Sequence, residues 1–287
     1  MKCIVALAQI DSILGDLQKN ILKHTDYIRK AKSGGADLVV FPELSLSGYS
    51  LKDLNWEVAI RPNTNKLLEP LIQESHDISI VLGCVEESSE YGMFNSAFCF
   101  EKGKITSVHR KIYPPTYGMF EELRYFSPGK AVQSFDSRLG TLGILICEDL
   151  WHLPLPYILA QAGAQIIIGM AASPTRLTGE DAKLRNQQVN SEQHRAYARL
   201  LSSYIVFCNR VGFEDGVNFW GGSEVIGPSG DVIVQAKLFE EDLVFAEIDG
   251  NEVRRARRVS RHFLDDDIHL VCRELKRVSR SSSSKQT

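Results

Sequence analysis

The run TLGILICEDLW, residues 141–151, joins an uninterrupted apolar stretch to a cysteine and two acidic residues. Because the apolar stretch does not alternate with polar residues, it predicts a strand buried on both faces, as in a sheet covered on both sides. Cys147 lies where this strand ends, and Glu148 and Asp149 follow it directly. The run therefore predicts a covered sheet with a thiol beside carboxylates at its edge.

Strand-like and helix-like segments alternate on both sides of this run. Residues 3–10 predict a buried strand, residues 16–33 carry an apolar stripe of helical period, and Gly34 and Gly35 end that helix. Further strands are expected at 36–43, 78–87, 141–150, 164–173, 204–212 and 241–249, hairpins at 95–111 and 222–237, and helices at 65–76, 154–162, 180–203 and 250–258. This mixture predicts stacked sheets covered by helices. With neither repeat nor linker, residues 1–277 are expected to form one domain, followed by a disordered tail at 278–287.

Composition and charge narrow the class of protein. The 287 residues are 44% hydrophobic and 24% charged, as in ordinary globular proteins, and the formal net charge of −3 gives no reason to expect a nucleic-acid partner. No apolar stretch reaches membrane-spanning length, and the N-terminal run MKCIVALAQI is too short for a signal peptide. None of the six cysteines forms a CxxC pair, so a metal site has no local support. We expect a soluble, cytoplasmic protein without a metal.

Three ionisable or nucleophilic side chains end apolar strands, namely Glu43, Lys111 and Cys147. Taken singly, each has an ordinary structural explanation, since charged residues are mostly solvated and free cysteines are mostly core residues. Taken together, they match what acyl transfer requires. A carboxylate can take the proton of a thiol, and an ammonium group can stabilise both the thiolate and an oxyanion. The seven histidines are scattered, so a Cys–His pair has little support.

Three segments resemble the nitrilase, or carbon–nitrogen hydrolase, superfamily: FPELSLSGY (41–49), HRKIYPPTYGMFEELRYFSPG (109–129) and LGILICEDLW (142–151). Their order and separation also match the family, with about 70 and then about 35 residues between the key positions. The resemblance covers nearly the whole chain. It implies an α/β fold of the four-layer α-β-β-α sandwich type and a reaction that needs no metal or organic cofactor.

The resemblance also implies roles for individual residues. Glu43 would be the general base, Lys111 the cation that stabilises the oxyanion, and Cys147 the nucleophile. A second glutamate, Glu122 in the sequence FEELRYF, would orient the lysine or the substrate amide. Without the resemblance, Glu122 and its neighbour Glu121 would be interpreted as a solvated acidic pair.

Within the superfamily, the motifs PELSLSGYSLKDL (42–54) and CEDLW (147–151) resemble the glutaminase domain of glutamine-dependent NAD synthetase. By that resemblance five residues would bind the substrate: Tyr49, Tyr117, Glu148, Ser173 and Arg176. The backbone N–H of Glu148 would help to hold the oxyanion, and Ser173 with Arg176 would meet a substrate carboxylate. The structural alternative is that the tyrosines simply pack and that Arg176 pairs with a surface acid.

The chain departs from NAD synthetases in one respect. Neither GGADL (34–38) nor GVNFWGG (216–222) is a phosphate-binding loop, and the chain stops where a synthetase would continue into an ATP-pyrophosphatase domain. We therefore expect either a free-standing amidase or a glutaminase subunit that serves a separate synthetase.

Residues 251–277 lie beyond the last expected core strand. The resemblance implies a homodimer or larger homo-oligomer formed through helical faces, with this segment as a C-terminal arm over the contact. The four arginines within 254–258 are expected to form salt bridges, to Asp265–Asp267 or to a partner subunit, and binding of an acidic ligand is the alternative.

The expected function is hydrolysis of a small linear amide, glutamine-like or N-carbamoyl, which releases ammonia or amine through a thioester acyl-enzyme. A nitrilase acting on a small nitrile is the alternative among enzymes, although nitrilases commonly carry Cys-Trp-Glu where this chain has Cys147-Glu148-Asp149. The alternative of another class is a non-catalytic or ammonia-supplying subunit of a separate synthetase.

Overall fold

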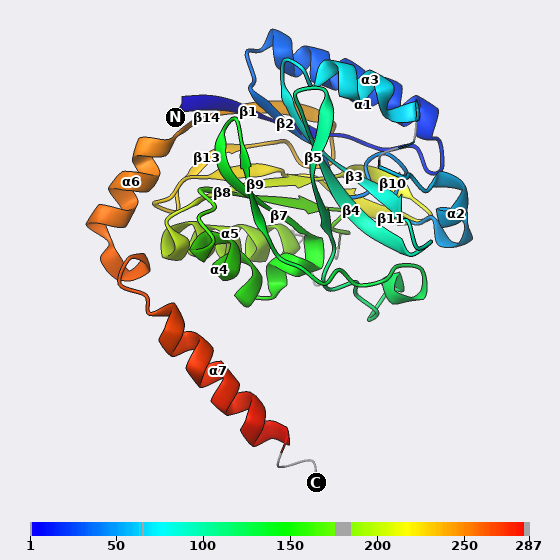
Figure 1. Cartoon of the computed structure of the whole chain (residues 1–287). Coiled ribbons are helices and arrows are strands. Elements are labelled where there is room, and N and C mark those ends of the chain that lie inside the picture. Colours follow the sequence, from blue (N-terminus) through cyan, green and yellow to red (C-terminus); the bar gives the residue numbers. More distant parts are fainter. Residues whose placement is uncertain (1, 63, 65, 176–184, 284–287) are drawn as a thin grey trace.

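Two six-stranded sheets stacked face to face form the centre of the chain (Figure 1). They are seen in a computed structural model, which describes residues 2–62, 64, 66–175 and 185–283. The strand order is β14-β1-β2-β3-β4-β5 in the first sheet and β13-β12-β9-β8-β7-β6 in the second. The strands β10 and β11 pair with each other in a separate small sheet.

The first sheet contains β14 (Asp242–Asp249), β1 (Lys2–Gln9), β2 (Leu38–Val40), β3 (Ser79–Glu87), β4 (Met93–Glu101) and β5 (Lys104–Arg110). The second sheet contains β13 (Val232–Gln235), β12 (Glu224–Ile226), β9 (Tyr204–Asn209), β8 (Ile166–Ala171), β7 (Gly140–Ile146) and β6 (Ser134–Ser137). The small sheet pairs β10 (Val211–Glu214) with β11 (Val217–Trp220). In each large sheet three neighbouring strands run parallel, β1-β2-β3 and β7-β8-β9, and antiparallel strands extend both sides.

Helices cover the two outer faces of this pair of sheets (Figure 1). The helices α1 (Leu17–Ser33) and α3 (Glu69–Glu74) pack on the first sheet, and α4 (Pro154–Gln161) and α5 (Arg185–Leu201) pack on the second. The predicted α-β-β-α sandwich is therefore confirmed. The shorter elements are α2 (Asn55–Val58) and the 3-10 turns η1 (Lys52–Leu54), η2 (Lys66–Leu68), η3 (Glu122–Arg124), η4 (Cys147–Trp151) and η5 (Arg261–Phe263).

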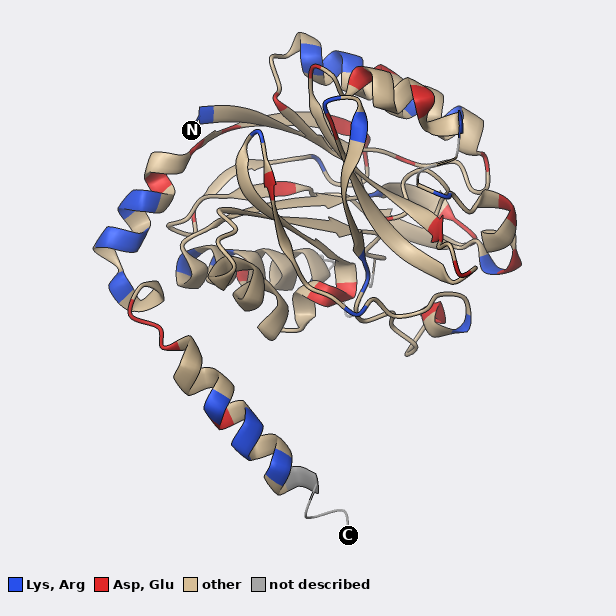
Figure 2. Cartoon of the chain, in the orientation of Figure 1, with Lys and Arg blue, Asp and Glu red and all other residues tan. Residues whose placement is uncertain are grey.

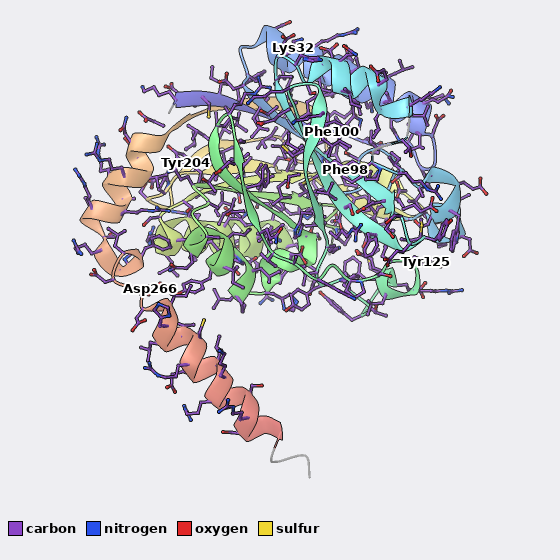
Figure 3. The ribbon with its side chains drawn as sticks, in the orientation of Figure 1. Lys32, Phe98, Phe100, Tyr125, Tyr204 and Asp266 are labelled. Carbon is purple, nitrogen blue, oxygen red and sulfur yellow. The ribbon has the colours of Figure 1, made fainter. Side chains whose placement is uncertain are left out.

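Side chains of the strand β4 alternate between these layers, and two of them, Phe98 and Phe100, are labelled in Figure 3. Phe98 and Phe100 belong to the apolar layer between the first sheet and its helices, while Ala97 and Cys99 belong to the layer between the two sheets. This alternation follows from the two-residue period of a strand. In this strand the small side chains belong to the layer between the sheets and the bulky ones to the layer under the helices.

The strand expected at 36–43 is shorter in the structure, where β2 spans only Leu38–Val40. Beyond it the chain crosses over β3 at Gly83, where an added Cβ atom would lie 2.3 Å from the backbone nitrogen of Leu44. This close approach requires a glycine on β3. Gly83 is far from residues 36–43 in the sequence, so the pattern of those residues could not reveal where β2 ends. The strand expected at 204–212 is divided in a similar way into β9 and β10.

The C-terminal segment first packs on the sandwich, through the buried Val253 and Phe263, and then extends away from it (Figure 1). It consists of α6 (Gly250–Val259), η5 and α7 (Ile268–Ser283), and residues 278–283, expected to be disordered, form the last turns of α7. Figure 2 marks Lys and Arg positions in blue along both helices. In α6 and η5 the ion pairs of the described residues are Arg255–Glu252 and Arg261–Asp265, so the predicted bridge from 254–258 to Asp265–Asp267 does not form within the chain. None of the helices in the described part of the chain is both long and apolar enough to cross a membrane.

Candidate active site

A buried lysine between two carboxylates forms the centre of the candidate site. The Nζ atom of Lys111 lies 2.7 Å from Oε1 of Glu43 and 2.7 Å from Oε1 of Glu122. All three side chains are exposed by 5% or less. Glu43 follows β2, Lys111 follows β5, and Glu122 begins η3. The structure therefore brings together three of the four residues that the sequence predicted for catalysis.

Uncharged donors surround the two carboxylates. The amide nitrogen of Asn95, on β4, donates to Oε1 of Glu43 at 2.7 Å and to Oε2 of Glu122 at 3.5 Å. The backbone N–H of Ala172, which follows β8, donates to Oε2 of Glu43 at 2.8 Å. The hydroxyl of Tyr49 donates to Oε1 of Glu122 at 2.6 Å. Glu43 is thus held by groups from both sheets, and its orientation depends on how the sheets pack.

The charges of this cluster stabilise one another against burial. Burial lowers the pKa of Lys111, but attraction to Glu122 and Glu43 more than offsets this effect and holds that pKa well above its usual value. Burial raises the pKa of Glu122, attraction to Lys111 lowers it, and repulsion from Glu43 raises it further. Lys111 is therefore charged at neutral pH, and Glu122 takes up a proton more readily than an exposed glutamate would.

The fourth predicted residue, Cys147, begins η4 directly after β7, and its backbone φ of 48° lies in the left-handed region. Residues other than glycine rarely adopt such a φ, and sharp strand-to-helix turns of this kind present nucleophiles in other hydrolases. The side chain is half-buried and packs against apolar residues on both faces of the second sheet.

The thiol of Cys147 is affected by the charges of the cluster. Burial raises the pKa of this thiol well above its usual value, the negative charge of Glu43 raises it further, and the positive charge of Lys111 opposes them. Cys147 is therefore a protonated thiol at neutral pH. To become a nucleophile it must give its proton to a base as it attacks.

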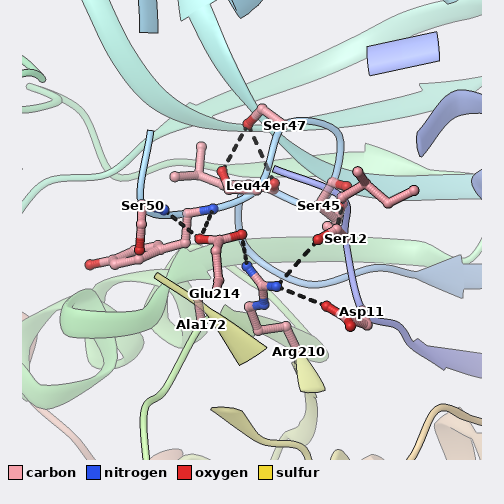
Figure 4. Close-up of polar contacts among 12 residues, drawn as sticks. Asp11, Ser12, Leu44, Ser45, Ser47, Ser50, Ala172, Arg210 and Glu214 are labelled. Atoms are coloured by element: carbon pink, nitrogen blue, oxygen red, sulfur yellow. Dashed lines mark hydrogen bonds and ion pairs between the residues drawn. The ribbon is translucent and has the colours of Figure 1, made fainter. Parts of the chain in front are cut away.

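A buried ion pair between Arg210 and Glu214 holds the loop that follows Glu43 (Figure 4). The Nη1 atom of Arg210 lies 2.7 Å from Oε2 of Glu214, and the other oxygen of Glu214 accepts hydrogen bonds from the backbone N–H groups of Tyr49 and Ser50. Arg210 also reaches Asp11, with 3.1 Å between Nη2 and Oδ1. The ion pair thereby fixes the backbone of Tyr49, whose hydroxyl contacts Glu122.

The other residues predicted to bind substrate lie in two separate contacts. The hydroxyl of Tyr117, a side chain exposed by 52%, donates to Oε2 of Glu148 at 2.8 Å. The hydroxyl of Ser173 accepts a hydrogen bond from Nε1 of Trp220 at 3.0 Å. Arg176 lies outside the described residues.

Sequence reasoning missed two buried polar residues, Asn95 and Asp149. Asn95 contacts both carboxylates of the cluster, and its signal was a polar side chain at the start of the largely apolar run NSAFCF. Asp149 has no exposed surface, although the sequence suggested only an acid next to the nucleophile. Among the residues that the structure describes, no three His, Cys, Asp or Glu side chains are placed so that they could hold a metal ion.

A four-layer sandwich that holds a cysteine, a lysine and two glutamates where its sheets meet defines a hydrolase of the nitrilase type. The chain belongs to the carbon–nitrogen hydrolase family, whose model matches residues 4–258. It is 33% identical over 258 residues to the glutamine-dependent NAD(+) synthetase of Acinetobacter baylyi. This match covers 87% of this chain and 45% of that protein. It is also 33% identical over 252 residues to the glutamine-dependent NAD(+) synthetase of Thermotoga maritima.

Solved structures lead to the same family. The glutamine-dependent NAD+ synthetase from Acinetobacter baumannii superposes with a TM-score of 0.78 and 32% identity, covering 88% of this chain and 47% of that one. The carbon-nitrogen hydrolase from Helicobacter pylori G27 superposes with a TM-score of 0.84 and 25% identity, covering 96% of this chain and 99% of that one. The chain spans about half the length of the curated synthetases it matches.

Proposed function

We propose that the chain hydrolyses the carboxamide of a small linear amide, with glutamine-like compounds first and N-carbamoyl compounds second. The observation that carries this proposal is the buried Lys111, bonded to Glu43 and Glu122, near a cysteine on a strained turn. A thiol, a carboxylate base and a fixed cation are the groups that acyl transfer from an amide needs. Membership of the family favours the same reaction class.

In the first half-reaction Glu43 takes the thiol proton of Cys147 while the sulfur attacks the amide carbon. The carbonyl oxygen becomes an oxyanion, which the ammonium of Lys111 and the backbone N–H of Glu148 stabilise. Lys111 has three N–H bonds, and the two carboxylates engage two of them. Protonated Glu43 then gives its proton to the substrate nitrogen, the C–N bond breaks, ammonia leaves, and a thioester remains.

In the second half-reaction Glu43 takes a proton from a water molecule, whose oxygen attacks the thioester carbon. The C–S bond breaks, the acid product leaves, and Glu43 returns the proton to the sulfur of Cys147. Glu122 keeps its proton state throughout. Together with Tyr49, it holds the ammonium group in place.

The substrate end of the site is proposed to use Glu148, Tyr117, Ser173 and Arg176. The Glu148 carboxylate is 17% exposed and is oriented by the Tyr117 hydroxyl, so it offers an acceptor for a substrate ammonium group. Ser173 and Arg176 would meet the carboxylate of an amino-acid substrate, as the resemblance implies. Glu148→Gln should therefore raise KM for glutamine more than KM for the analogue that lacks the α-amino group.

Ammonia release tests the reaction and its mechanism. It should be measured with glutamine, asparagine, short aliphatic amides, carbamoyl amines and a nitrile, with Cys147→Ala as the blank. We expect release from one amide class, loss of release in the blank, and a covalent adduct of acyl mass on Cys147 in wild-type protein quenched with acid during turnover. Release that survives Cys147→Ala would overturn the mechanism, and turnover of the nitrile alone would favour the nitrilase alternative.

The relatives of this chain favour one biological setting, in which the ammonia serves a synthetase. Those relatives are glutamine-dependent NAD(+) synthetases, of which this chain spans about half. A subunit that supplies ammonia should speed amide-dependent synthesis when it is mixed with a synthetase that otherwise needs free ammonia. An active amidase without any such effect would instead point to a free-standing enzyme.

The C-terminal arm is proposed to pair with the arm of a second copy. Along α7, Ile268, Val271 and Leu275 recur at intervals of three and four residues, which places them on one stripe of the helix. Ile268 and Leu275 are exposed. The acids Asp265–Asp267 precede the helix and bases such as Arg277 lie near its end, so antiparallel pairing would bring opposite charges together.

The mass of the full chain in solution tests this pairing. We expect a dimer or larger assembly that Leu275→Asp dissociates, while Leu22→Asp, at an equally exposed position on α1, leaves it intact. An assembly unaffected by Leu275→Asp would contradict the role of the arm.

A further inference from the structure

Two residues after the proposed nucleophile, one buried carboxylate accepts four hydrogen bonds. Asp149 Oδ1 accepts the backbone N–H groups of Ile112 at 2.9 Å and Tyr113 at 3.0 Å. Its Oδ2 accepts the N–H of Ile146 at 3.1 Å and lies 3.0 Å from Nε2 of His109. Because an ionised carboxylate only accepts hydrogen bonds, Nε2 of His109 must carry the proton in this contact. Each oxygen of Asp149 thus holds two donors.

These donors lie on two segments that no sheet ladder joins. Residues 109–113 continue from β5, at the edge of the first sheet, and contain Lys111. Residues 146–149 end β7 in the second sheet and contain Cys147. Their relative position is therefore not fixed by backbone pairing, although the proposed chemistry needs the ammonium group near the thiol.

A second contact ties the same two segments just beyond the carboxylate. The rings of Tyr113 and His152 stack with 3.5 Å between their centres and 8° between their planes. Asp149 and this stack together hold the segment of the lysine against the turn of the cysteine at two points. The stack is partly exposed, whereas Asp149 is completely buried, so the carboxylate is the stiffer of the two links.

We propose that Asp149 is a positioning residue that sets the distance between the ammonium group of Lys111 and the thiol of Cys147, with His109 fixing its second oxygen. Asp149 itself does not contact the substrate in this scheme. The inference rests on the proposed function, because that function assigns joint work to the lysine and the cysteine.

An amide cannot replace this carboxylate. Asn at position 149 would offer one acceptor oxygen and one NH2 donor, and the NH2 group would face a backbone N–H in either orientation. With the oxygen toward Ile112 and Tyr113, the N–H of Ile146 loses its acceptor, and the flipped orientation leaves the other two N–H groups without one. The two segments must then separate or rotate, and a shift of about 1 Å can cost about a hundredfold in rate.

Two measurements on Asp149→Asn test this inference. One is kcat and KM for the best amide substrate. The other is the pH profile of Cys147 alkylation by iodoacetamide, which reports how closely a positive charge approaches the thiol without requiring turnover. Lys111→Met gives the reference profile for a thiol without its cation. Glu101→Gln is the matched control, because Glu101 is also a buried carboxylate that accepts from Ser79 and the N–H of Arg138, far from the site.

We expect Asp149→Asn to lower kcat about a hundredfold with KM within about threefold, and to move the alkylation profile toward that of Lys111→Met. Glu101→Gln should lower the melting temperature without either effect. If Asp149→Asn melts as Glu101→Gln does but keeps the wild-type kcat and alkylation profile, the residue is only structural and the inference fails. If wild type turns over no amide, the proposed function fails, and the alkylation profiles alone decide the inference.

A pair of variants at His109 separates the hydrogen bond from the loss of packing. Gln can place a donor nitrogen near the position of Nε2, whereas Phe keeps the ring and removes the donor. His109→Gln should retain most of the wild-type kcat, and His109→Phe should lose about tenfold. Equal activity in the two variants would refute the part assigned to His109.

Discussion

Replacing Lys111 by methionine removes a buried positive charge and leaves two carboxylates facing each other. Methionine is unbranched and of similar length, so the packing volume changes little. Breaking a buried ion pair by removing one partner costs about 3–5 kcal/mol. Here Glu43 and Glu122 share the lysine at 2.7 Å each, so the cost is relieved only when one carboxyl takes up a proton. Glu122 is the candidate, because burial already raises its pKa.

The destabilisation should therefore grow with pH. In the variant the native state keeps a proton that the unfolded chain releases above the ordinary pKa of glutamate. The native state then binds more protons than the unfolded state, so the free energy of unfolding falls as pH rises. Each pH unit in this interval costs about 1.4 kcal/mol, so the variant should lose up to about 3 kcal/mol more at pH 8.0 than at pH 5.5.

The wild-type lysine shows no such dependence in this range. Its pKa in the folded chain is raised, so its contribution to stability is fully present below the ordinary pKa of lysine and is lost only as pH rises through the higher folded value. Lys111 therefore stabilises the wild type equally at pH 5.5 and pH 8.0, and the comparison isolates the carboxyl.

Urea unfolding at the two pH values, followed by tryptophan fluorescence, measures these differences. The set is wild type, Lys111→Met, Glu122→Gln and the double variant, with Lys30→Met as an exposed control whose ion pair with Asp26 is worth about 0–1 kcal/mol. The double variant should recover most of the loss at pH 8.0, because a neutral amide does not need the lysine. An equal loss at both pH values, or a double variant no more stable than Lys111→Met at pH 8.0, would refute the reasoning.

Three further predictions concern other parts of the site. Alkylation of Cys147 by iodoacetamide should accelerate only above pH 9, because burial and then Glu43 raise the thiol pKa, and a profile that levels off near pH 8 would contradict this. Asn95→Asp adds a third carboxylate to the cluster and should lower kcat for ammonia release about a hundredfold at pH 8 and less at pH 6, whereas an unchanged kcat would remove Asn95 from the site. Gly48→Ala, at a φ of 82° and with a Cβ 2.7 Å from Glu214 Oε2, should lower the free energy of unfolding by about 2–3 kcal/mol. The control is Gly216→Ala, at a φ of 79° with no atom within 4 Å of the added Cβ, and its free energy of unfolding should fall by about 1 kcal/mol. If both variants lose the same amount, backbone strain alone explains the loss and the contact with Glu214 contributes nothing.

The layers of the fold could be predicted because burial leaves a direct mark on composition. The strand β7 lies in a sheet covered on both faces, so its residues from Leu142 onward are apolar without alternation, and η4 begins where the acids begin. The stripe on α1 gave the helix and its buried side, and Asp16 caps its start through a 3.0 Å bond from the N–H of Lys19. These features depend on neighbours within a few residues, which a single sequence contains.

The site could be predicted only where a side chain has no good structural reason to stand at a strand end. Glu43, Lys111 and Cys147 stood out for that reason. Asn95 and Asp149 did not, because all their polar partners except the N–H of Ile146 lie 27 to 52 residues away and no local pattern records them. The same limit explains β2, whose end is dictated by the close passage of the chain over Gly83.

The site owes its geometry to the packing of two sheets rather than to either sheet alone. Glu43 and Lys111 follow strands of the first sheet, and Glu122 comes from the turn η3. The second sheet leads to Cys147 and to the Ala172 N–H that orients Glu43. The apolar layer between the sheets, that N–H and the Asp149 carboxylate are among the links that hold the two halves together. Because a packed interior does not deform continuously, such a layer can hold two sets of charged groups in register without a covalent link. The small side chains Ala97 and Cys99, which are buried in this layer, therefore contribute to the geometry of the site as well as to the stability of the fold.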